Sequence, residues 1–181
     1  MQRSEALALV KANVSNKNLV KHMIATEACM AELAGHFKEE VETWALTGLL
    51  HDIDYDKTAN DPGNHGRIAL TILKPYGLDE RVLYAIQAHP GVVPAKSRMD
   101  WALYAVDPLT GLIVAACLMH PNKKLASLDV EFITRRFKEK RFAAGANRDQ
   151  IEKCSELGLS LTDFIAICLA GMQRVSSELG L

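Results

Sequence analysis

The chain has 181 residues, and 21 Lys and Arg face 22 Asp and Glu, which gives a formal net charge of -1 at pH 7. This balance argues against a protein whose main task is to bind nucleic acid or an anionic membrane. Apolar residues make up 49% of the chain and charged residues 24%, as in ordinary globular domains. The length predicts a single domain over residues 1–181.

Neither a membrane span nor a secretory signal is expected. No uncharged apolar run reaches the roughly 18 residues that a spanning helix needs. The N-terminal segment MQRSEALALVKANV carries charges among its apolar residues, unlike a signal peptide. The four cysteines form no C-x-x-C pair and are interpreted as reduced, buried residues. We therefore expect a cytoplasmic protein.

Apolar residues recur at helical spacing along most of the chain. They predict helices over residues 4–14, 16–36, 39–51, 65–74, 79–89, 99–120, 129–142, 147–157 and 162–179. Two polar, Gly- and Pro-containing segments, 52–64 and 90–98, are predicted loops. Because no segment alternates with period two beside hairpin signals, the predicted fold class is all-α.

Histidines and aspartates gather at the predicted helix ends and flanks that border these loops. The set is His22, His51, Asp52, His65, His89 and Asp107. A single histidine at a helix C-terminus has a simpler explanation, since imidazolium complements the helix dipole. Asp107 is harder to explain in that way, because an unpaired carboxylate in an apolar helix needs a partner or a cation.

The same residues carry a resemblance to a known family. The order His22, His51-Asp52, Asp107 resembles the metal-dependent HD superfamily of phosphohydrolases, as do the segments LLHDIDYD, HGRIALTIL and YAIQAHPG. The resemblance covers residues 16–116. It implies an HD-domain bundle of about seven to nine helices, with a metal-binding core over 16–120 and a C-terminal helical extension over 121–181.

The resemblance also implies a metal centre. One ion would take His22, His51, Asp52 and Asp107, and a second would take His65 and His89 with Asp52 as the bridge. Imidazole and carboxylate ligands suit Mn, Fe, Co, Ni or Zn, so one or two divalent ions per chain are expected. Adjacent helical residues point about 100° apart, so His51 and Asp52 converge only where their helix ends.

The implied activity is hydrolysis of a phosphoester bond in a small phosphorylated molecule, with a nucleotide as the favoured substrate. No nucleic acid and no membrane partner are expected, and a homodimer is left open. Two alternatives also remain open: an HD-type di-iron oxygenase, and a non-catalytic regulatory module that binds a metal or nucleotide.

The chain departs from the common family pattern at two positions. Asp54 replaces the glycine of the HDIG segment, and Pro90 replaces the second histidine of an HH pair. The missing histidine argues against a centre of three metals. The GYP signature of the cyclic-dinucleotide branch is also absent.

Several charged residues are candidates for catalysis or substrate binding. Asp52 is predicted to be catalytic. Asp54 and Asp56 are also candidate catalytic residues, acting either as a general acid or as supports that orient the histidines. The alternative is that both form exposed turns. The candidate contacts to a substrate phosphate are Lys57, Arg67, Arg135 and Lys138. For the basic run around Arg135 and Lys138, a solvated helix face is the alternative interpretation.

Overall fold

The computed structural model describes residues 1–181 and is all-α, as predicted. Eight helices have seven or more residues, within the predicted seven to nine. They are α1 (Arg3–Asn13), α2 (Lys17–Phe37), α3 (Val41–Leu50), α5 (Arg67–Leu73), α6 (Glu80–Ala88), α7 (Arg98–Met119), α8 (Val130–Lys138) and α10 (Leu161–Arg174). Three helices have four residues: α4 (Tyr55–Thr58), α9 (Arg148–Ile151) and α11 (Ser176–Leu179). Short 3-10 turns occupy Pro62–Asn64, Lys74–Tyr76, Leu125–Ser127 and Glu152–Leu157.

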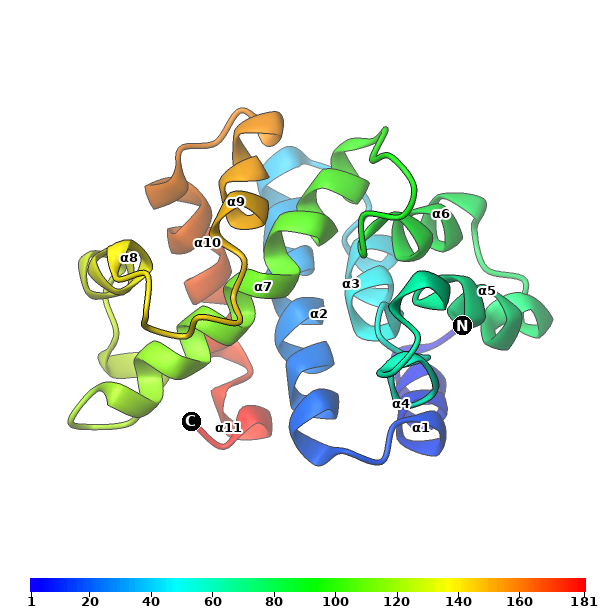
Figure 1. The fold of residues 1–181 in the computed structure, drawn as a ribbon, viewed down its shortest axis with the longest axis horizontal. Helices are drawn as coiled ribbons and strands as arrows, with labels where there is room; N and C mark the ends of the chain where they lie inside the picture. The colour runs from blue at the N-terminus through cyan, green and yellow to red at the C-terminus, as the bar shows by residue number, and fades with distance from the viewer.

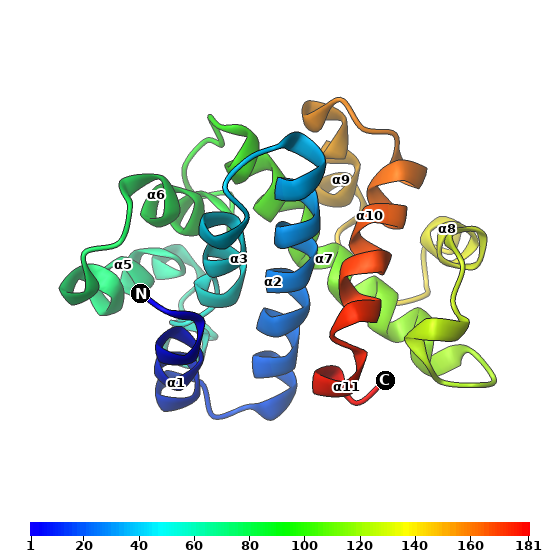
Figure 2. The ribbon, with the colours of Figure 1, turned by 180° about the vertical axis from the view of Figure 1, so that it is seen from behind.

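The long helices α2 and α7 form the centre of the bundle (Figure 1). Helix α2 packs against α3, α7 and α10, and most of its residues from 23 to 34 are buried. Helices α4, α5 and α6 lie towards one end of the molecule, and α8 lies at the other (Figure 1). In the view from behind, α2 lies between α3 and α10 (Figure 2).

By length and composition, α7 is the one single helix that is long and apolar enough to cross a membrane. In this fold 56% of its most apolar window is buried inside the protein, as in the core helix of a bundle. Pro108 lies inside α7 and lacks the N–H that would bond the carbonyl four residues earlier. Gln150 donates to that carbonyl, Tyr104 O, at 2.8 Å, and so attaches α9 to α7 beside Asp107.

Several predicted boundaries were wrong, and the predicted loop 52–64 contains the short helix α4 and the 3-10 turn Pro62–Asn64. Helix α1 begins at Arg3 instead of residue 4, after the cap residue Gln2, whose backbone N–H donates to Glu5 Oε2 at 2.8 Å. Helix α8 ends at residue 138 instead of 142, because the Arg148 guanidinium donates to the carbonyls of Phe142 and Ala143 in the loop that follows. The last predicted helix is broken after Arg174 into α10 and α11.

Candidate metal centre

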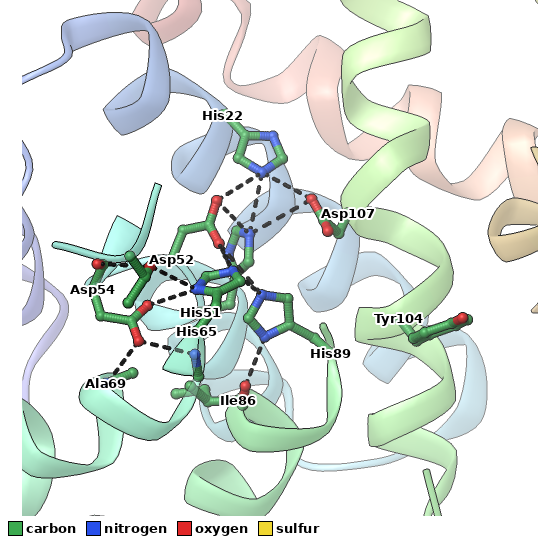
Figure 3. Close-up of polar contacts among 12 residues, drawn as sticks. His22, His51, Asp52, Asp54, His65, Ala69, Ile86, His89, Tyr104 and Asp107 are labelled. Atoms are coloured by element: carbon green, nitrogen blue, oxygen red, sulfur yellow. Dashed lines mark hydrogen bonds and ion pairs between the residues drawn. The ribbon is translucent and has the colours of Figure 1, made fainter. Parts of the chain in front are cut away.

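Six side chains from five elements converge in the middle of the bundle (Figure 3). His22 comes from the second turn of α2, and Asp107 comes from the middle of α7. The other four lie at or beyond the ends of short helices. They are His51 and Asp52 after α3, His65 before α5, and His89 after α6. The structure therefore brings together all six residues that the sequence predicts as metal ligands.

Asp52 divides the cluster into two halves. Its Oδ2 lies 3.4 Å from His51 Nε2 and 3.6 Å from His22 Nε2. Its Oδ1 lies 3.1 Å from His65 Nε2 and 3.3 Å from His89 Nε2. Asp107 Oδ1 completes the first half at 3.1 Å from His22 Nε2. Each oxygen of one carboxylate thus faces a different pair of imidazoles, which is the geometry of a bridging ligand.

His51 and His89 are oriented by the helices that they terminate. The Nδ1–H of His51 donates to Gly48 O at 2.8 Å, and that of His89 donates to Ile86 O at 2.6 Å. Carbonyls in the last turn of a helix lack intrahelical partners, so a histidine placed one position beyond the helix can use them. Because a carbonyl only accepts, the proton of each neutral ring is on Nδ1, and Nε2 faces the centre with its lone pair.

His65 is oriented by Asp54. The Nδ1–H of His65 donates to Asp54 Oδ1 at 2.8 Å, and the backbone N–H groups of Gly66 and Ala69 donate to Asp54 Oδ2, both at 2.9 Å. Asp54 is fully buried. The carboxylate thus holds both the imidazole and the first turn of α5, where it also satisfies free N–H groups at the helix start.

His22 is held by α7. The Thr110 hydroxyl donates to Asp107 O at 2.9 Å, so its oxygen accepts from His22 Nδ1–H at 2.8 Å. The close approach of α2 and α3 brings His22 and His51 together: their Nε2 atoms are 3.1 Å apart. This approach depends on Gly48, where a Cβ atom would lie 2.8 Å from Thr26 O.

The carboxylates strongly favour a positive charge in the centre. Burial opposes protonation of His51, but the Asp52 carboxylate outweighs it and raises the pKa of His51 to about 9. Burial also opposes protonation of His65, yet hydrogen bonds to Asp52 and Asp54 raise its pKa to about 10. Burial alone would raise the pKa of Asp52, but the charge of His51 lowers it well below the ordinary value.

These donors fit a divalent transition metal. The Nδ1–H group of each of the four histidines donates to an acceptor, so the four Nε2 lone pairs face the two carboxylates. Because lone pairs and carboxylates repel one another, this arrangement requires a cation between them. Without a metal, protons supply that charge, as the raised pKa values indicate. Mixed imidazole and carboxylate donors without a thiolate suit Mn, Fe, Co, Ni or Zn. The arrangement can therefore hold a metal, and the donors alone do not select which one.

The structure does not bring the predicted acids Asp54 and Asp56 into contact with the open side of the centre. With no exposed atom and both oxygens bonded, Asp54 is neither the exposed turn former nor the proton donor that the sequence suggested. It is one of the predicted supports of a histidine. Asp56 is exposed and accepts from Ser15 N and Oγ at 2.7 and 2.6 Å, so it joins the turn to the start of α2 instead of serving the metal ligands.

The predicted substrate-binding cations also lie outside the ligand cluster. Lys57 is exposed and reaches Asn13 at 3.5 Å, and Arg67 is exposed at the start of α5. Arg135 and Lys138 belong to α8, which packs on α7 and α10 at the end of the molecule away from α4–α6 (Figure 1). The Arg135 guanidinium lies over the Phe132 ring of its own helix. Helix α8 therefore does not cover the centre, because its apolar face packs elsewhere.

Sequence reasoning missed Thr110 and Gly48, which orient His22 and allow the two helices to approach. Thr110 lies three residues after Asp107 and thus on nearly the same helix face, which was a usable signal. It also missed Tyr55, whose exposed ring meets His65 edge-on with 5.8 Å between centroids.

Comparison with known proteins finds one matching family and several more distant relatives. The model of the HD domain family matches residues 19–117. Ribonuclease Y of Desulfotalea psychrophila is 30% identical over 138 residues, covering 74% of this chain and 26% of that protein. An uncharacterized protein of Methanocaldococcus jannaschii is 26% identical over 162 residues, covering 84% of this chain and 92% of that protein. No solved structure matches the chain closely enough to count as a relative.

The relatives differ in the share of their own length that aligns with this chain. The chain spans 26% of the length of the Desulfotalea ribonuclease, and 16% of the related Ribonuclease Y of Salinispora arenicola, which is 28% identical over 95 residues. The likeness to the Methanocaldococcus protein extends over most of both chains. The region shared with the ribonucleases is therefore only a part of those proteins.

Proposed function

This chain belongs to the HD domain family, and on that premise we propose that it is a metal-dependent hydrolase of a phosphoester bond in a small phosphorylated molecule, with a nucleotide as the favoured substrate. The observation that carries this proposal is the convergence of four Nε2 atoms on two carboxylates while every Nδ1 is held by an acceptor. Such an arrangement is prepared for a cation before the cation binds.

In the proposed enzyme, the two halves of the cluster would each hold one ion. The first ion would be held by His22, His51, Asp52 and Asp107, and the second by His65 and His89 together with Asp52. Divalent ions in such a site supply Lewis acidity, which makes water acidic near neutral pH and neutralises charge on a phosphoryl group.

The protein's own residues fix the donors. The ends of α3 and α6 hold His51 and His89, so these two rings cannot rotate without breaking a buried hydrogen bond. Asp54 keeps the proton of His65 on Nδ1. Asp52 remains ionised because its pKa lies well below the ordinary value. Lys57 and Arg67 stay predicted contacts to substrate.

The relatives named Ribonuclease Y support the reaction class, because cleavage of RNA is also cleavage of a phosphoester. They do not supply the substrate, since the chain covers 26% or less of those proteins. The formal net charge of -1 favours a small substrate over a nucleic acid. A short RNA oligonucleotide is therefore an informative comparison probe.

The test is phosphate release from a panel of nucleoside monophosphates and other phosphomonoesters, together with fragment formation from a short RNA, using protein stripped of metal and reloaded with Mn²⁺, Fe²⁺, Co²⁺, Ni²⁺ or Zn²⁺. We expect metal-dependent turnover that Asp52→Ala abolishes. The matched control Asp149→Ala removes an exposed carboxylate on α9 and should leave turnover unchanged. Oxygen uptake by iron-loaded protein without phosphate release would contradict the proposal and favour the oxygenase.

A further inference from the structure

The two most exposed ligands lie on α2 and α7. The side chains of Asp107 and His22 are 30% and 21% exposed, that of His65 is 16% exposed, and those of His51 and His89 are 0% and 1% exposed. A substrate phosphate therefore approaches beside Asp107 and His22. The surface next to these two residues decides which organic group can accompany it.

A cavity of about 510 Å³ lies next to this place; His22 lines it and Asp107 does not. His22 and Thr110 form the wall that it shares with the metal centre, and Val114, Leu118 and Leu181 give it aliphatic sides. On α7, residues 107, 111, 114 and 118 follow the spacing i, i+4, i+7, i+11, so one face of the helix carries the ligand Asp107 and the cavity wall.

The opposite wall is held in place by a specific contact. Lys21 on α2 donates from Nζ to Leu179 O at 2.7 Å, and so ties α11 to α2 across the cavity. Lys21 is the one Lys or Arg that lines the cavity, and no Asp or Glu side chain does so. The remaining lining is aliphatic, amide, hydroxyl or backbone. This lining suits an uncharged organic group better than a second ionised one.

We propose that this cavity binds the organic group of the phosphoester, so that it selects substrates carrying an uncharged group of about nucleoside size. The inference rests on the proposed function and adds a specificity site to it. The volume falls in the range of about 300–1,000 Å³ typical of small-molecule sites. The phosphate lies at the end formed by His22 and Thr110, and the organic group lies along Val114 and Leu118.

Gly111 offers a way to close the cavity without disturbing the ligands. It is exposed within α7 and lines the cavity, and a Cβ atom added there meets nothing within 4 Å. A leucine at this position fills space that is open, and it suits a helix better than glycine does. Gly35 is a matched control, since it is also helical with nothing within 4 Å of an added Cβ, and it lies thirteen residues after His22 on α2, about 20 Å along the axis.

The experiment is calorimetric titration of Mn²⁺-loaded protein with a non-hydrolysable phosphonate analogue of adenosine 5′-monophosphate, as the nucleotide probe, and separately with inorganic phosphate. We expect Gly111→Leu to weaken nucleotide binding by about tenfold or more and phosphate binding by less than about twofold. Gly35→Leu should change neither. Elemental analysis of each variant confirms that it carries the same metal content.

Three results would overturn the cavity assignment. The first is unchanged nucleotide binding in Gly111→Leu, and the second is equal weakening of both probes, which would place the effect at the metal centre. The third is a wild-type protein that binds the nucleotide no more tightly than phosphate. Failure of the proposed hydrolase activity is a separate outcome. If no substrate releases phosphate, the binding measurements still decide whether the cavity binds the organic group.

Discussion

Replacing Asp54 by asparagine tests how a buried carboxylate controls a metal ligand. Asp54 Oδ2 accepts from two backbone N–H groups at 2.9 Å, and Oδ1 accepts from His65 Nδ1–H at 2.8 Å. An asparagine of the same shape has only one oxygen. If that oxygen keeps the two backbone bonds, the amide NH₂ faces His65 Nδ1 and can only donate. The His65 proton must then move to Nε2, where it blocks the lone pair that faces Asp52.

Two magnitudes follow from this geometry. Two bonds from N–H to a charged acceptor become bonds to a neutral one, which costs about 1 kcal/mol each and about 2 kcal/mol of unfolding free energy in total. Loss of a support for a ligating histidine typically weakens metal binding by about 10–100-fold. Asp54→Asn should therefore fold, with a lower melting temperature, and lose affinity in the half of the centre that contains His65 and His89.

The assay is metal titration followed by elemental analysis, with thermal unfolding to confirm the fold. Asp56→Asn is the matched control, because that carboxylate is exposed and bonds only to Ser15. It should bind metal like the wild type. If Asp54→Asn binds the same number of ions with unchanged affinity, then His65 is not a ligand or Asp54 does not set its tautomer, and the reasoning fails.

Three further predictions concern the same centre. In metal-free protein, His51 and His65 have pKa values raised from 6.5 to about 9 and about 10, so their stabilisation is complete below pH 6.5 and is lost as pH rises through 9–10. Thermal unfolding should show a melting temperature that falls over that range. Gly48→Ala places a Cβ 2.8 Å from a backbone oxygen of α2 and should lower unfolding free energy by about 1–3 kcal/mol. Thr110→Val removes the acceptor of His22 and should weaken metal binding by about 10–100-fold in titrations.

Each of these has a result that would count against it. A melting temperature of metal-free protein that stays level between pH 7 and 10 would show that protonated imidazoles do not stabilise the fold. Gly35→Ala, where the added Cβ meets open space, should not be destabilised, and equal loss at both glycines would refute the packing argument. Thr110→Ser keeps the hydroxyl and should restore metal binding; a serine variant as weak as valine would contradict the proposed support of His22.

Several features could be predicted from local sequence because local physics determines them. Helical periodicity identified most helices, although their ends moved by a few residues where side chains such as Arg148 bonded loop carbonyls. His51 and His89 were recognisable because each lies one residue beyond an apolar helix. Asp107 was recognisable because an ionisable residue in an apolar helix needs a partner.

Other features depend on residues distant in sequence and were decided by tertiary packing. Arg135 and Lys138 were candidate contacts to a substrate phosphate, yet the apolar face of α8 packs on α7 and α10, which leaves Arg135 away from the ligands. The role of Asp54 depended on where the start of α5 would lie, since its partners are 11 to 15 residues later.

The sequence by itself determined an all-α protein of ordinary charge, with six candidate ligands at positions where helices end or carry an unexplained acid. Only the tertiary structure decided that Asp52 divides these ligands into two halves, that every Nδ1 has an acceptor, and that a cavity beside His22 is lined by Gly111 and Leu181. The reason is physical. Helix ends and periodicity follow from neighbouring residues, whereas ligand orientation and cavity shape follow from contacts between residues as far apart as Lys21 and Leu179.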